Sequence, residues 1–217
     1  MFITSSDGMR IAYDRQGNGP TLLLLQGFAA TRQIWQELGY VEHLSQEFTV
    51  ITMDRRGIGE SDMPTDPAAY RVERVLGDIE AVLQVCEVGH YAVWGHSFGG
   101  STAFQLATCS SQVERAIIAG SFFGCVYPQE RIDEIVNWLE RYLEAKAKGT
   151  LAELGIDAEE DAHLSQMNIP AQIACWRALV HWPIVHPQDV RCPTLVYVGS
   201  ADERVATPLE EHRQEIE

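Results

Sequence analysis

A chain of 217 residues, 46% of them hydrophobic, is long enough for one domain with a substantial core and too apolar for intrinsic disorder. Its 31 aspartates and glutamates outnumber 16 lysines and arginines, and the formal net charge of −15 disfavours nucleic acid and anionic membrane surfaces as partners. The sequence has no apolar run near the roughly 20 residues of a transmembrane helix, and no basic N-terminal region followed by an apolar core. The five cysteines are scattered and form no Cys-x-x-Cys pair, so we expect reduced thiols and a cytoplasmic location.

The first half of the sequence alternates short aliphatic runs with helical patterns. Asp7-Gly8 is a hairpin turn signal between two short strands, and Thr21 to Leu25 is a continuous apolar run, typical of a strand buried on both faces. The other expected elements are strands over 48–53, 91–94 and 116–119 and helices over 31–46, 70–88 and 97–109. Because strands that alternate with helices pair in parallel, the predicted fold class is α/β, a mostly parallel central sheet with helices on both faces.

This alternation stops after Phe123. Residues 126–188 are helical in pattern almost throughout, with an amphipathic stripe from Ile132 to Leu143. An aliphatic strand returns at Pro193 to Val198 and leads into Gly199-Ser200-Ala201-Asp202. The sequence therefore predicts a core made of residues 1–125 and 189–217, interrupted by a helical insertion over 126–188.

The strongest chemical signal is Gly95-His96-Ser97-Phe98-Gly99, directly after an expected strand and directly before an expected helix. A Gly-x-Ser-x-Gly placed this way makes a sharp turn that presents the serine hydroxyl at the carboxyl edge of the sheet. Gly95 and Gly99 are needed because the strand and helix backbones crowd a serine held in strained geometry. The free N–H groups and the positive dipole end of the helix face the same place. This pattern predicts a nucleophile at Ser97.

A second signal, Leu25-Gln26-Gly27-Phe28, ends an earlier strand. Acyl transfer needs two N–H donors aimed at the developing oxyanion, and the backbone N–H groups of Phe28 and Phe98 are the natural pair. The alternative is that Gln26-Gly27 is only a turn that ends the strand.

With these motifs the chain resembles the α/β-hydrolase superfamily, in its lidded esterase, haloperoxidase-like and C–C-bond hydrolase branch. The segment Asp54-Arg55-Arg56-Gly57-Ile58-Gly59-Glu60-Ser61-Asp62 resembles a loop of this family that braces the pocket without a catalytic role. The resemblance implies that the insertion over 126–188 is a lid and that no metal or organic cofactor is required. One departure is Gln26, where many relatives carry histidine. Since the oxyanion donor is a backbone N–H two residues later, at Phe28, we expect the change to alter orientation more than chemistry.

The same resemblance assigns Asp202, at the end of the last strand, as the carboxylate that orients a catalytic histidine. Glu203 is adjacent to it, and the alternative is a surface aspartate at the start of a loop. An aspartate at position 97 would have indicated a dehalogenase or an epoxide hydrolase, and Ser97 argues against both.

A serine hydroxyl needs a base within hydrogen-bond reach, and in this fold the histidine follows the acid in the chain. Among the 15 residues after Asp202, His212 is the one candidate for a substitute base. Pro208 as a first helical residue predicts a surface helix there instead. We expect the side chain of His96 to point away from the serine Oγ. Of the remaining histidines, His43 and His90 lie in early elements, and His163, His181 and His186 lie in the insertion. Among these, His181 or His186 could reach the pocket.

The simplest hypothesis is that the sequence stops before the final strand and helix and before the catalytic histidine. The strand near Thr194 would then be an apolar edge, which favours self-association. The sequence thus predicts a serine hydrolase of apolar esters or related small carbonyl compounds, acting through an acyl-enzyme, with little activity in this chain. Two alternatives stay open: a non-catalytic ligand receptor on the same scaffold, and cofactor-free perhydrolysis by the same residues.

Overall fold

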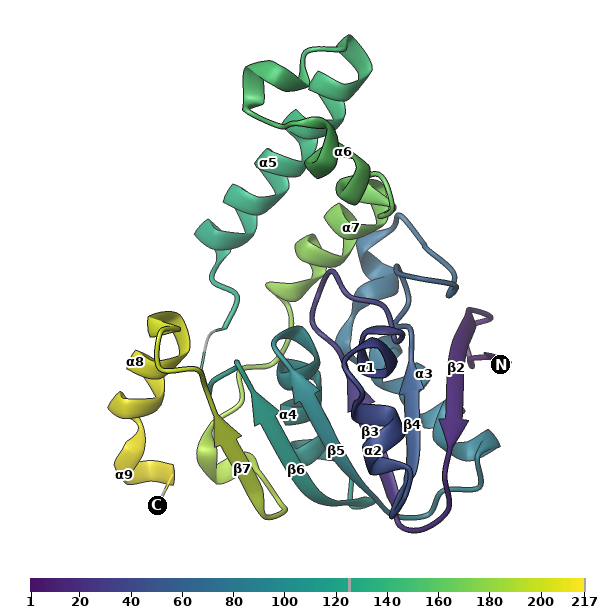
Figure 1. Ribbon diagram of the computed structural model, residues 1–217. Coiled ribbons are helices and arrows are strands. Elements are labelled where there is room, and N and C mark those ends of the chain that lie inside the picture. The colour runs from purple at the N-terminus through teal and green to yellow at the C-terminus, as the bar shows by residue number, and fades with distance from the viewer. Residues whose placement is uncertain (125, 217) are drawn as a thin grey trace.

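The computed structural model describes residues 1–124 and 126–216, and Cys125, at the expected boundary of the core, lies outside the described residues. The strands are β1 (Phe2–Thr4), β2 (Arg10–Gln16), β3 (Thr21–Leu25), β4 (Thr49–Met53), β5 (Tyr91–His96), β6 (Val113–Ala119) and β7 (Thr194–Tyr197). They form one sheet in the order β1-β2-β4-β3-β5-β6-β7. β3 to β7 pair in parallel, while β1 and β2 are antiparallel and are joined by the turn expected at Asp7-Gly8. The predicted, mostly parallel α/β sheet is confirmed (Figure 1).

The helices follow the predicted alternation with two differences. In chain order they are α1 (Ile34–Glu37), α2 (Tyr40–Leu44), η1 (Pro67–Tyr70), α3 (Val72–Val85), α4 (Phe98–Cys109), α5 (Gln129–Lys148), η2 (Leu151–Leu154), α6 (Ala158–Leu164), α7 (Ile169–Leu179), η3 (Pro187–Asp189), α8 (Glu203–Glu211) and α9 (Arg213–Ile216). The single helix expected over 31–46 was wrong. Gly39 has a φ of 78°, a left-handed conformation that ends α1 and separates it from α2. Pro208 lies inside α8 and not at its start.

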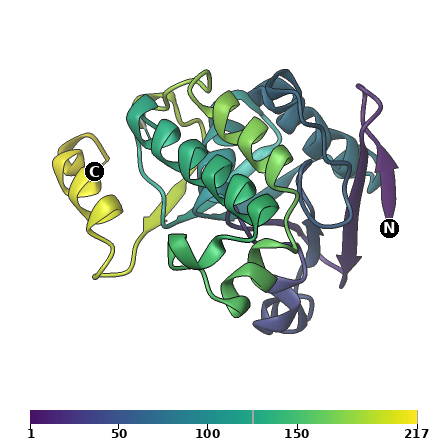
Figure 2. The same ribbon diagram turned by 90° about the horizontal axis from the view of Figure 1, so that it is seen from above.

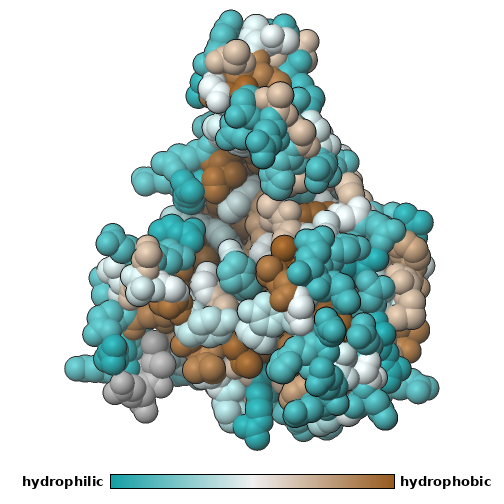
Figure 3. Space-filling view, in the orientation of Figure 1, coloured by the Kyte–Doolittle hydropathy of each residue, from teal (hydrophilic) through white to brown (hydrophobic). Residues whose placement is uncertain are grey.

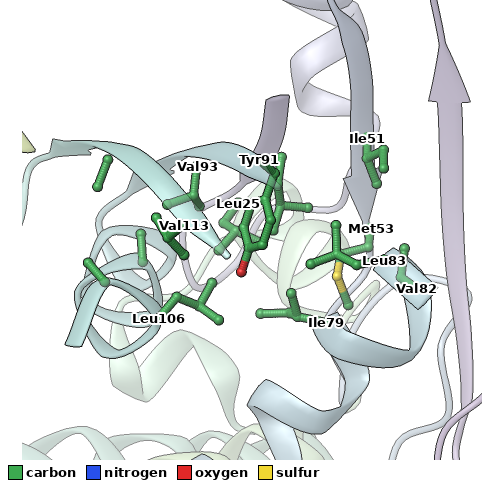
Figure 4. Packing of buried hydrophobic residues seen from close by; sticks show 14 of the residues in the cluster. Leu25, Ile51, Met53, Ile79, Val82, Leu83, Tyr91, Val93, Leu106 and Val113 are labelled. Atoms are coloured by element: carbon green, nitrogen blue, oxygen red, sulfur yellow. The ribbon is translucent and has the colours of Figure 1, made fainter. Parts of the chain in front are cut away.

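Successive residues of β3 face opposite layers of helices, which places one helical layer on each side of the sheet. Leu22 and Leu24 pack in a cluster with Trp35 of α1. Leu23 and Leu25 belong to the main core, beneath α3 and α4. Figure 4 shows that main core, with side chains from the strands and from both helices meeting at its centre: Leu25, Ile51, Met53, Ile79, Val82, Leu83, Tyr91, Val93, Leu106 and Val113.

The helical insertion rises above the carboxyl ends of the parallel strands (Figure 1), and from above α5 and α7 lie across the sheet (Figure 2). α5 turns one apolar side toward α7, and this cluster includes Phe98 at the start of α4. The indole Nε1 of Trp182 donates a hydrogen bond to the carbonyl oxygen of Tyr70 at 3.0 Å. The insertion is therefore packed against the core by apolar and polar contacts.

The last strand lies at an edge of the sheet. β7 pairs with β6 and with no other strand among the described residues, and Leu195 and Tyr197 are 59% and 42% exposed. α8 and α9 lie outside β7 and cover neither side chain. Self-association through this edge stays a prediction. No helix in the described parts of the chain combines the length and apolar character needed to cross a bilayer.

Candidate active site

The chain turns sharply at Ser97, between β5 and α4. Ser97 has φ 54° and ψ −114°, a region that non-glycine residues rarely adopt. A Cβ added to Gly95 would lie 2.1 Å from the carbonyl oxygen of Gly99. One added to Gly99 would lie 2.1 Å from the carbonyl oxygen of Leu25. Both positions therefore admit only glycine, and their close backbone packing holds the serine in its strained conformation.

The loop after β3 lies directly against this turn. A Cβ built on Gly27 would lie 3.6 Å from the Cβ of Ser97, and the rings of Phe28 and Phe98 meet edge to face with centroids 5.5 Å apart. Phe98 is the first residue of α4, so its N–H has no acceptor within the helix. Within the described residues, no backbone hydrogen bond uses the N–H of Phe28 or Phe98. The two expected oxyanion donors thus belong to residues that contact each other beside Ser97.

Gln26, the departure from the family pattern, is buried and ties the end of β3 to β4. Its Nε2 donates to the carbonyl oxygen of Met53 at 2.9 Å. Its Oε1 and the Nε of Arg55 are buried atoms without a hydrogen-bond partner among the described residues. Both residues line a cavity of about 20 Å³, which is room for one water molecule. The Gln26 side chain therefore links the end of β3 to the end of β4.

Ser97 lines an open cleft of about 770 Å³ between the core and the insertion. Figure 3 shows a recess between these two parts of the surface. Aromatic side chains from several elements form much of its wall: Phe28, Trp35, Tyr40, Trp94 and Tyr197. The insertion contributes His163 and Gln166, whereas His181 and His186, the two histidines considered from the sequence, are not among its lining residues. The reason is that α6 overhangs this side of the core, while His181 and His186 follow α7.

Asp202 lies between β7 and α8, at the carboxyl end of its strand, as Ser97 lies at the carboxyl end of β5. Its carboxylate accepts hydrogen bonds from Nε and Nη2 of Arg204 at 3.1 and 3.0 Å, and this contact, with a smaller contribution from His96, lowers the pKa of Asp202. The side chain remains 30% exposed. In the described parts of the chain, Asp202 bonds to no histidine.

No histidine in the part of the chain that the structure describes is hydrogen-bonded to Ser97. His96 is exposed, and its ring lies beside Gly27 and Gly120, whose added Cβ atoms would lie 3.3 Å from Nδ1 and 3.5 Å from Nε2. No hydrogen bond joins the Oγ of Ser97 to any histidine over the described residues. His212 follows α8, which leads away from the cleft toward α9 beside η3, and it is not a lining residue of the cleft.

The loop after β4 is held by two buried ion-pair networks. Asp54 is fully buried and accepts hydrogen bonds from the backbone N–H of Arg32 at 2.7 Å and of Glu60 at 2.9 Å. Arg56 pairs with Asp78 through Nε at 2.7 Å and with Asp7 through Nη1 at 2.8 Å. The hydrogen bond from Arg56 holds the pKa of Asp7 well below its usual range. These contacts are those of a structural brace.

Two residues at the site were missed from the sequence. His163, which the sequence places in the insertion without a place in the pocket, lines the cleft. Arg55 is buried between Phe28 and Phe98, with its Cζ 4.5 and 4.9 Å from their ring centroids. The sequence signal that could have identified Arg55 is the adjacent pair Arg55-Arg56. Asp78 and Asp7 pair with Arg56, which leaves Arg55 available to the site. Within the described residues, no three His, Cys, Asp or Glu side chains gather as a metal site requires.

Known proteins share this architecture. The chain matches mouse (Mus musculus) Epoxide hydrolase 4 at 29% identity over 117 residues, which are 53% of this chain and 32% of that protein, so the match spans about a third of the relative's length. An alpha/beta hydrolase from Sphaerobacter thermophilus superposes with a TM-score of 0.66 at 26% identity, covering 100% of this chain and 87% of that one. A structure from work on carboxylesterases of Nitrososphaera gargenis, at 20% identity, shows the same fold with a TM-score of 0.80 over 100% of this chain and 86% of that one.

The family model described as "alpha/beta hydrolase fold" matches residues 20–148, which is more than half of the sequence. That range contains β3 to β6, the loop after β4, the turn at Ser97 and the first helix of the insertion. Because this model matches more than half of the chain, and the matched residues form most of the predicted parallel sheet, the chain belongs to the family of the alpha/beta hydrolase fold.

Proposed function

We propose that this protein is a serine hydrolase of esters or related small carbonyl compounds, with Ser97 as the nucleophile. The observation that carries the proposal is the strained turn at Ser97, which opens into a cleft beside the two residues with unused N–H groups. Strain of this kind costs about 1–3 kcal/mol and is retained chiefly at functional sites.

In the proposed reaction, the Oγ of Ser97 attacks the carbonyl carbon and its proton passes to a base. The N–H groups of Phe28 and Phe98 hold the oxyanion of the tetrahedral intermediate. The intermediate collapses to an acyl-enzyme as the leaving alcohol takes the proton. Water, activated by the same base, then hydrolyses the acyl-enzyme and restores the serine. Asp202 orients the base, a histidine that the described residues do not bring to Ser97.

The cleft supports an apolar substrate of modest size. Its volume of about 770 Å³ falls within the usual range for small-molecule sites, and its walls are rich in aromatic rings. In this proposal the insertion acts as a lid over the substrate. Epoxide opening by an enzyme carboxylate would need an aspartate at position 97. Because a serine occupies that position, we do not propose this chemistry.

The test supplies imidazole as an external base, because no histidine among the described residues is hydrogen-bonded to Ser97. We expect the purified chain to hydrolyse p-nitrophenyl butyrate slowly. Added imidazole should raise the Ser97-dependent rate by roughly 10-fold, because a general base supplies about 10²–10⁴-fold in such enzymes. Ser97→Ala at the same imidazole concentration is the control, since imidazole alone cleaves the ester. Equal rates with and without the Ser97 hydroxyl would reject the nucleophile.

The second candidate is a ligand receptor on the same scaffold. Two observations favour it: Asp202 is hydrogen-bonded to Arg204, and among the described residues no histidine is hydrogen-bonded to the Oγ of Ser97. A fluorophosphonate probe separates the two candidates. Covalent labelling at Ser97 supports the hydrolase, whereas a chain that resists labelling but gains thermal stability from apolar esters supports the receptor.

A further inference from the structure

Arg55 is buried at the back of the turn and contacts the residues that carry both expected oxyanion donors. Its guanidinium lies between the rings of Phe28 and Phe98, 4.5 and 4.9 Å from their centroids. Its Nη2 donates to the carbonyl oxygen of Phe28 at 2.8 Å, and its Nη1 donates to the carbonyl oxygen of Arg56 at 3.1 Å. Arg55 therefore holds Phe28 by both its ring and its backbone.

Over residues 1–124 and 126–216, no carboxylate pairs with the guanidinium of Arg55. No ion pair in the described residues includes Arg55, although Arg56 beside it pairs with two aspartates. A buried cation without a counter-ion is costly, and hydrogen bonds and aromatic faces offset only part of that cost. A negative charge that develops next to Phe28 and Phe98 would supply the missing partner, so the cation favours the charged intermediate over the neutral ester.

Arg55 also connects this half of the site to the helical insertion. The Oε1 of Gln172, on α7, accepts from Nη2 of Arg55 at 2.8 Å. The Nε2 of Gln172 donates to the carbonyl oxygen of Gly57 at 2.6 Å, and the Gln172 side chain is almost fully buried. The position of α7 is thus transmitted to Phe28 through one guanidinium.

We propose that Arg55 is a positioning residue for oxyanion stabilisation: it fixes Phe28 against Phe98 and couples that arrangement to the seating of α7. This inference rests on the proposed function, in which Phe28 and Phe98 supply the oxyanion donors. Lysine cannot replace Arg55, because an ammonium lacks the planar fork that stacks between two rings while it donates in several directions.

The experiment measures phosphonylation of Ser97 by an alkyl fluorophosphonate in imidazole buffer. The Oγ–P bond forms, fluoride leaves, and the hydroxyl proton passes to imidazole. Intact-mass spectra over time at several probe concentrations separate the maximal rate from the apparent affinity. For Arg55→Met we expect the maximal rate to fall roughly 10- to 100-fold with affinity within about two-fold, because a misplaced oxyanion donor weakens only the charged state.

Three further variants make the result specific. Arg55→Lys should recover little of the rate. Gln172→Met, which keeps Arg55 but removes its link to α7, should lower the rate several-fold. Arg177→Met is the matched control, because Arg177 lies on the exposed side of α7 and pairs with Glu140; it should match the unmodified chain. Circular dichroism melts establish that each variant is folded.

The outcomes separate the inference from the proposed function. If the unmodified chain is labelled at Ser97 and the folded Arg55 variants react at its rate, Arg55 is not a positioning residue, while the serine hydrolase stands. A change in affinity alone would also reject the positioning role, since Arg55 would then merely seat the insertion. If Arg55→Met does not fold, Arg55→Lys and Gln172→Met decide the question. Failure to label the unmodified chain rejects the proposed function and this inference together.

Discussion

The candidate site has two halves, a nucleophile half at Ser97 and an acid half at Asp202, which differ in how tightly they are packed. The backbone on both sides of Ser97 is tightly packed, since a Cβ added to Gly95 or Gly99 would lie 2.1 Å from a carbonyl oxygen. Around Asp202 the packing is open: a Cβ added to Gly199 would meet nothing within 4 Å, and the Asp202 side chain is 30% exposed. The position of the serine is therefore set by the fold itself, whereas the position of the carboxylate depends on what packs against it.

The difference follows from the place of each half in the sheet. The serine follows β5, which has β3 and β6 on its two sides, and the buried α4 follows it. Asp202 follows β7, which pairs with β6 alone among the described residues. A strained backbone conformation persists only where the surrounding packing enforces it. The strained residue, Ser97, accordingly follows an interior strand, β5.

The largest expected effect tests this contrast in stability. We expect Gly99→Ala to lower the free energy of unfolding by at least about 4 kcal/mol, or to prevent folding, because the helix and the end of β3 would have to separate. Gly199→Ala should change it by less than about 0.5 kcal/mol, since nothing crowds that position. Urea denaturation followed by tryptophan fluorescence measures both. Similar values for the two variants would show that the nucleophile half is as tolerant as the acid half.

The same contrast explains what the sequence could predict. The sheet, the sharp turn and the brace after β4 arise from short-range patterns: alternating strands and helices, glycines at fixed spacing, and a loop rich in arginine and aspartate. The break of the first expected helix at Gly39 was missed because an isolated glycine within a helical pattern is often tolerated.

Long-range contacts account for what sequence reasoning missed. Arg55 meets Gln172 across 117 positions of the chain, and no local pattern connects them. His163 reaches the cleft because α6 overhangs the core, which depends on how the insertion packs and not on the spacing of its apolar residues. Contacts of this kind depend on tertiary packing, and the periodicity of a local sequence pattern does not predict them.

A second prediction sharpens the comparison through pH. Arg56 lowers the pKa of Asp7 in the folded protein below its unfolded value. The stability that this carboxylate contributes is therefore complete above about pH 4 and is lost as the pH falls through the folded pKa. Asp7→Asn should lower the free energy of unfolding by about 1–2 kcal/mol at neutral pH, and the gap between the two proteins should close in acid. Urea titrations at several pH values measure that gap, and a gap that widened in acid would contradict the sign.

The smallest effect is expected at the acid half. Arg204 and Asp202 form an exposed ion pair, so Arg204→Ala should leave the urea midpoint unchanged. The variant should nevertheless raise the pKa of Asp202 toward its ordinary value, because the hydrogen bonds from Arg204 are the main cause of its depression. The titration of the Asp202 side-chain carbon by NMR reports this change, with Glu210 as an internal control, whose pKa is lowered by Arg213 and should not move. A loss of stability comparable to that of Asp7→Asn would mean that the acid half is held by the fold after all, and that the two halves of the site are alike.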